Sequence, residues 1–141
     1  MTATTQIIFG TVLLLVCAAF HVAMIVVAVR LLAKLVAMFK WHGSVNTMSM
    51  RHQLALIAAA FSSIVFSHTV QVWALAVAVL VMGAITTMTD ALYFSLVTYT
   101  TLGYGDVTLS SDHRLFGAMG AVTGLLNFGL STAFLVGHLG K

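Results

Sequence analysis

The 141-residue sequence is 61% hydrophobic and only 6% charged, and its formal net charge is +3. Because a soluble domain carries about a quarter charged residues, this composition excludes an ordinary soluble protein, and the few scattered positive charges exclude a nucleic-acid-binding surface. At about 20 residues for each membrane span, the length has room for about three spans with short connections, so we expect an all-α membrane protein.

The first predicted span covers residues 7–29, and its apolar character continues beyond them with interruptions at Arg30 and Lys34. Long cationic side chains near the end of a span can extend to the headgroup layer. The polar residues 40–52 that follow predict a loop. Residues 1–52 therefore form a first unit that consists of one membrane-spanning helix and a loop.

The second predicted span, residues 54–84, has an unusually polar middle. Its polar side chains are Ser62, Ser63, Ser67, His68, Thr69 and Gln71. Ionisable groups at this depth are costly and indicate a functional site. Counted from the expected helix ends at Lys40 and His52, His68 and His21 of the first span lie at a similar depth, since each helical residue rises by about 1.5 Å.

Two interpretations of these histidines are open. In the first, His21 and His68 pair with each other, or share a water or an ion with Gln71, and the group senses pH. In the second, each is a neutral histidine that forms hydrogen bonds between packed helices. The second interpretation requires no titration and is favoured.

Residues 90–100 are too short to cross a membrane and only half apolar, so they predict a re-entrant helix. Asp90 suits its first turn, where the helix dipole favours a negative charge. Residues 115–139 form the third predicted span, and Lys141 follows it.

The charges predict the orientation of the chain in the membrane. The connection between the first two spans contains most of the basic residues, namely Arg30, Lys34, Lys40 and Arg51, and positively charged loops stay in the cytoplasm. We therefore expect a multi-pass protein of the cell (plasma or inner) membrane with its N-terminus outside and its C-terminus in the cytoplasm. The acidic residues Asp90, Asp106 and Asp112 then all lie outside.

Between the re-entrant helix and the third span lies the segment Thr100-Thr101-Leu102-Gly103-Tyr104-Gly105-Asp106. A run of backbone carbonyls can replace the water shell of a potassium ion. In an ordinary strand, successive carbonyls alternate in direction, so turning them to one axis needs unusual dihedral angles at alternate residues, which glycine adopts at little cost. A glycine turn between helices is the simpler alternative, but it explains neither the threonine pair nor Asp106. The spacing therefore predicts an ion-selectivity filter at residues 101–105.

The text ALYFSLVTYTTLGYGD, followed by RLFGAMGAVTGLLNFGL, resembles the pore domain of tetrameric potassium channels. It is most similar to the short bacterial channels that have an outer helix, a pore helix and an inner helix. The resemblance covers residues 53–141, with the outer helix at 54–84, the pore helix at 90–100, the filter at 101–105 and the inner helix at 115–139. The first span is an extra N-terminal transmembrane helix outside this resemblance.

The resemblance implies that four identical chains surround one axis within membrane lipid and that K+ passes along this axis. The ions would be held by the backbone carbonyls of Thr101, Leu102, Gly103 and Tyr104, and Gly105 completes the filter. The hydroxyl of Thr101 would add the innermost ring of oxygens.

The resemblance also implies which residues support the filter. Tyr93 and Phe94 stand where aromatic side chains of the pore helix brace the filter tyrosine. Thr100 lies directly behind the filter. Val97 stands where some relatives carry a carboxylate, so Asp106 needs another partner or water.

Two residues of the third span are further candidates. Gly124 matches the position of a gating hinge in the inner helix of relatives, while close packing of helices is the alternative role for a small residue. Asn127, in the next turn, is the best candidate for a polar group that lines a cavity, because an amide inside a span must meet water or a partner.

The sequence thus predicts a homotetrameric potassium channel that conducts K+ passively, with K+ as the transported ion and no organic cofactor. We expect no voltage sensor, because no span carries arginine at every third position, and no cytosolic ligand-binding domain, because the sequence ends at Lys141. An enzyme is not expected, since no nucleophile–base pair is visible. The alternatives are a weakly selective cation channel, a non-conducting membrane scaffold or regulatory protein, and a transporter subunit.

Overall fold

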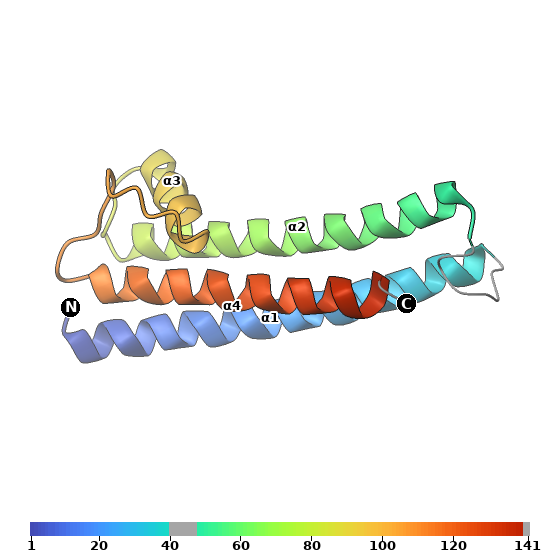
Figure 1. The fold of residues 1–141 in the computed structure, drawn as a ribbon. Helices are drawn as coiled ribbons and strands as arrows, with labels where there is room; N and C mark the ends of the chain where they lie inside the picture. Colours follow the sequence, from blue (N-terminus) through green and yellow to red (C-terminus); the bar gives the residue numbers. More distant parts are fainter. Residues whose placement is uncertain (40–47, 140–141) are drawn as a thin grey trace.

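The computed structural model describes residues 1–39 and 48–139, and within this part of the chain the regular secondary structure is all α-helix (Figure 1). The helices are α1 (Ala3–Met38), α2 (Met50–Val81), α3 (Met88–Tyr99) and α4 (Arg114–Leu139). Of these, α1, α2 and α4 are long and apolar enough to cross a membrane. The predicted all-α fold with three spans is therefore confirmed, and the chain is built as a multi-pass membrane protein.

Helix α1 extends well beyond the predicted span at residues 7–29, and the ends of the other helices differ from the predicted ones by at most four residues. Local hydrogen bonds explain where α2 and α3 begin. Ser49 caps α2, with its carbonyl accepting from the backbone N–H groups of His52 and Gln53, so the predicted loop at 40–52 ends earlier. The hydroxyl of Thr87 accepts from the N–H of Asp90 and starts α3 at Met88.

The predicted basic loop lies only partly in the described residues. Arg30 and Lys34 belong to α1 and are exposed, and Arg51 belongs to the first turn of α2. Lys40 and Lys141 lie outside the described residues.

The three long helices run side by side, and α3 lies across one end of them (Figure 1). The chain starts at this same end. The terminal amine of Met1 lies 3.8 Å from the carboxylate of Asp112. The side chain of Gln6 donates to the carbonyl of Ser111 over 3.3 Å and accepts from the N–H of Leu115 over 3.0 Å. The N-terminus and the segment between α3 and α4 therefore lie on the same side of the bundle.

Two apolar clusters hold the bundle together. The larger one joins α2, α3 and α4 near the end that carries α3, and it consists of Val72, Leu75, Ala76, Val79, Ile85, Ala91, Phe94, Tyr99 and Phe116. The smaller one joins α1, α2 and α4 farther along the bundle and consists of Ala28, Ala60, Ile64 and Phe134. Many large apolar side chains point outward, among them Ile8, Leu15, Val16, Phe61, Phe66 and Val136. Such a surface is suited to lipid or to neighbouring chains rather than to water.

Candidate functional site

Residues 100–106, which contain the predicted filter and are called the filter segment below, start directly at the end of α3. The N–H of Thr101 donates to the carbonyl of Thr98 over 3.0 Å, and the N–H of Leu102 donates to the carbonyl of Val97 over 3.0 Å. The N–H of Gly103 reaches the same Val97 carbonyl over 3.3 Å. The last turn of the helix thus fixes the start of the segment.

Alternate residues of the filter segment have left-handed backbone conformations. The φ angles are 61° at Thr101, 59° at Gly103 and 82° at Gly105. Glycine adopts this region freely, but for a β-branched residue such as Thr101 it is a true outlier that the surroundings must enforce. This alternation is what a row of carbonyls facing one axis requires, and residues 101–106 are all exposed in the single chain.

Tyr93 and Asp106 form the main side-chain contact that stabilises this segment. The hydroxyl of Tyr93 donates to Asp106 over 2.6 Å, and the other carboxylate oxygen accepts from the N–H of Val107 over 3.1 Å. The bond from Tyr93 holds the pKa of the Asp106 carboxyl below its ordinary value. Val97 cannot hydrogen-bond to Asp106, so the sequence offered no partner for this carboxylate. In the structure Tyr93, one turn earlier in α3, is the partner.

The other expected support residues lie around this contact. Phe94 is buried in the larger apolar cluster, and Val97 is buried beside Gly103 and Gly105 in an open cavity of about 270 Å³. The hydroxyl of Thr100 donates to the carbonyl of Leu96, so it caps its own helix.

Gly124 lies where α4 crosses the end of α3. A Cβ atom at this position would clash with the backbone carbonyl oxygen of Tyr99. The missing side chain therefore lets the two helices touch. Of the two roles considered for Gly124, the geometry favours close packing.

Asn127 has no exposed surface, which differs from the expectation of a cavity-lining amide. Its Nδ2 donates to Oε1 of Gln71, while its Oδ1 has no partner. The side chain therefore faces α2 in the interior of the chain, because the apolar residues of α4 occupy the outward face.

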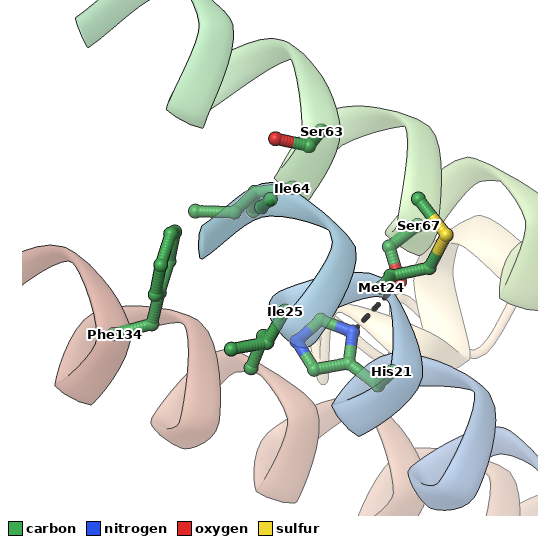
Figure 2. A pocket seen from close by; sticks show the side chains of 8 residues that line it. His21, Met24, Ile25, Ser63, Ile64, Ser67 and Phe134 are labelled. Carbon is green, nitrogen blue, oxygen red and sulfur yellow. Dashed lines mark hydrogen bonds between the residues drawn. The ribbon is translucent and has the colours of Figure 1, made fainter. Parts of the chain in front are cut away.

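Asn127 belongs to a polar network in the middle of the bundle, formed by His21, Ser67, His68, Gln71, Tyr99, Asn127 and Ser131. The imidazole centroids of His21 and His68 are 4.9 Å apart, so the two histidines lie at one level. Both also form hydrogen bonds between packed helices, as the second interpretation expected. Figure 2 shows His21 turned from α1 toward Ser67 of α2, next to a cavity of about 10 Å³ that has room for at most one water.

Sequence reasoning missed Tyr99 and Ser131 as members of this network. Ser131 lies four residues after Asn127 and therefore on the same face of α4, which is a signal that was available. Tyr99 carried a weaker signal, since a buried tyrosine hydroxyl usually finds a hydrogen-bond partner.

Comparison with known protein families gives one match. A family model described as an ion channel matches residues 54–140. The match covers more than half of the chain, includes α3 and the filter segment, and leaves α1 outside. No curated protein and no solved structure matches the chain.

Proposed function

Because the chain belongs to the ion channel family, we propose that it is a potassium-selective channel. K+ moves passively along a row of backbone carbonyls at residues 101–105. In this assignment α2 is the outer helix, α3 the pore helix and α4 the inner helix.

The alternation of left-handed residues at Thr101, Gly103 and Gly105 carries this proposal. Such conformations are costly, and strain of this kind is concentrated at functional sites. A turn that merely joins α3 to α4 does not need a strained threonine. In a filter, the strained backbone would turn successive carbonyl oxygens toward one axis, where they replace the hydration shell of K+.

One chain provides only one side of each ion site, so the functional unit is a ring of chains. We propose a homotetramer in lipid, in the cell membrane, with the N-terminus and the filter outside. The exposure of Leu102 (59%) and Tyr104 (69%) in the single chain supports this assembly, because neighbouring chains would cover such apolar side chains.

The test is ion flux through the purified protein in liposomes, with K+ and Na+ gradients compared. Gly103→Ala places a side chain at φ 59° and should abolish the preference for K+. Gly83→Ala is the matched control, because Gly83 has φ 67°, and like Gly103 it has no atom within 4 Å of the added Cβ. Both variants carry a similar backbone strain of about 1–2 kcal/mol, but only one of them is in the filter.

Each alternative predicts a different result. Equal K+ and Na+ rates in the unmodified protein would indicate a weakly selective cation channel. An absence of flux from a correctly assembled protein would indicate a scaffold or regulatory protein. A mass in detergent that does not correspond to four chains would contradict the tetramer.

A further inference from the structure

The hydrogen bonds of the polar network have defined directions, and Gln71 fixes them. The Nε2 of Gln71 lies 3.2 Å from the carbonyl of Ser67, which can only accept, so the orientation of the amide is determined. The same Nε2 therefore donates to Nδ1 of His21 over 3.1 Å. On the other side of the amide, Oε1 accepts from the hydroxyl of Tyr99 over 3.0 Å.

These directions determine which nitrogen of each neutral histidine carries the proton. Since Nδ1 of His21 accepts, its Nε2 donates to Ser131 over 2.9 Å. Since the only proton of Tyr99 is used on Gln71, the tyrosine oxygen accepts from Nδ1 of His68 over 2.9 Å. The Nε2 of His68 then accepts from the hydroxyl of Ser131 over 2.9 Å. In this arrangement all four imidazole nitrogens of the two neutral histidines have a hydrogen-bond partner of the matching kind.

The network can take one further proton at His68 without leaving a group unpaired. The hydroxyl of Ser131 also lies 3.0 Å from the carbonyl of Asn127. If Nε2 of His68 is protonated, it donates to Ser131, and Ser131 turns its own proton to that carbonyl. At His21, Nδ1 lies 2.9 Å from the hydroxyl oxygen of Ser67, which can accept, but also 3.1 Å from the amide donor of Gln71. A proton on Nδ1 would therefore face a second donor, which makes His21 the less favourable of the two proton acceptors.

His68 is also the more accessible of the two histidines. It lines an open groove of about 460 Å³ beside Trp73, Leu96 and Phe128, whereas His21 is 1% exposed. Among the described residues, the titratable groups that face this level are His21 and Cys17 of α1 and Tyr99 of α3. From α4, Phe128 and Ser131 contact His68, and neither carries a charge.

We propose that His68 is a positioning residue that accepts a proton within the membrane and thereby reduces cation conduction. The inference rests on the proposed function. Through Tyr99, His68 contacts the C-terminal end of α3 directly before the filter segment. A helix C-terminus carries partial negative charge that favours cations. A proton on His68 places positive charge there, so acid should lower the flux.

The experiment measures K+ flux in liposomes at about pH 7.5 and at about pH 5, on either side of the ordinary histidine pKa. The unmodified protein should lose flux by about twofold to fivefold in acid, the factor expected for one charge at a helix terminus. His68→Gln retains a donor and an acceptor but cannot take the proton, and its flux should not change with pH. His113→Gln is the control, because the imidazole of His113 contacts the hydroxyl of Ser110, three residues before it, and no member of the polar network within the described residues.

Ser131 provides a second, independent test. Ser131→Ala removes the hydroxyl that accepts from protonated His68, so the loss of flux in acid should shift to lower pH. Ser131→Thr keeps a hydroxyl and should retain the loss of flux in acid. Ser63→Ala is its control, because the hydroxyl of Ser63 bonds only to carbonyls of its own helix. A structural role alone would not move the pH profile in this way.

The outcomes separate the inference from the proposed function. Absence of K+ flux at both pH values overturns the proposed function. Flux that does not depend on pH, or a response that survives in His68→Gln or disappears in His113→Gln, overturns the inference. A readout without conduction is the ¹⁵N NMR signal of the imidazoles, which should show His21 protonated at Nε2 and His68 at Nδ1 near pH 7.5; the opposite tautomers would also overturn it.

Discussion

The filter segment and the polar network differ in how complete each is within one chain. In the filter segment, residues 101–106 are exposed, and the backbone is strained at Thr101. In the polar network, Gln71, Tyr99 and Asn127 are at most 1% exposed, and hydrogen bonds within the chain join them. In the proposed channel, the first region needs other chains to complete it, while the second is assembled by the fold of a single chain.

This difference shows that the two regions depend on the sequence in different ways. The filter segment is a local sequence feature, because consecutive residues supply the whole repeated pattern of carbonyls. The polar network is a feature of packing, because its members come from four helices and meet only when these helices take a defined rotation. The two regions are adjacent at Tyr99, which ends α3 and takes part in the network.

The largest effect is expected where the two regions touch. In Gly124→Ala, the added Cβ would clash with the backbone carbonyl oxygen of Tyr99. Overpacking of this kind costs about 1–3 kcal/mol or more, so the variant should lose assembled protein, measured as the thermal stability of the oligomer in detergent. Gly129→Ala is the control, because no atom lies within 4 Å of its Cβ. If both variants lose stability equally, contacts between chains at α4, rather than Tyr99, decide the result.

The next effect compares the same chemical change in the two regions. Tyr99→Phe removes a buried hydroxyl that joins His68 to Gln71, and Tyr93→Phe removes an exposed hydroxyl that joins α3 to Asp106. Leaving a buried group unpaired costs about 1–3 kcal/mol, so Tyr99→Phe should lower the free energy of unfolding, and Tyr93→Phe should lower it much less. Chemical denaturation of both variants under identical conditions checks this order. A larger loss in Tyr93→Phe would show that the filter segment contributes more to stability than its exposure suggests.

The smallest effect concerns acid at the filter segment. The pKa of Asp106 is lowered by the bond from Tyr93, so the bond contributes stability above the ordinary carboxyl pKa of about 4 and loses it as the pH falls through the lower value in the folded protein. The hydrogen bond between Tyr93 and Asp106 should therefore be unaffected at about pH 5, the acid condition of the proposed flux experiment. Tyr93→Phe should move the acid transition of Asp106 upward, measured by ¹³C NMR of the carboxyl. An unchanged transition would contradict the role of this hydrogen bond.

Sequence reasoning reached the three spans and the short helix α3 because each depends on consecutive residues. The re-entrant insertion of α3 and the filter at residues 101–105 stay predictions. Sequence reasoning also placed His21 and His68 at one level, since helical rise converts residue number directly into depth. It did not find that Tyr93 holds Asp106, because the contact forms only when the segment after the filter folds back onto α3.

It did not find that Asn127 bonds to Gln71, because the rotation of a helix is set by the helices that pack against it. The starts of α2 and α3 differed from the predicted ones because the extended backbone at Ser49 and the side-chain cap of Thr87 determine them.

Contacts of α1 with α4 have a mechanical consequence. The two helices are joined at successive heights by the pairs Gln6–Leu115, Gly10–Met119 and His21–Ser131. Gly124 lies between the second and third of these heights, yet α1 has neither glycine nor proline between residues 10 and 21. A bend in α4 at Gly124 would require α1 to bend at the same height, where α1 has no residue that favours bending. The two helices are therefore expected to tilt together as one rigid unit rather than to bend in the middle.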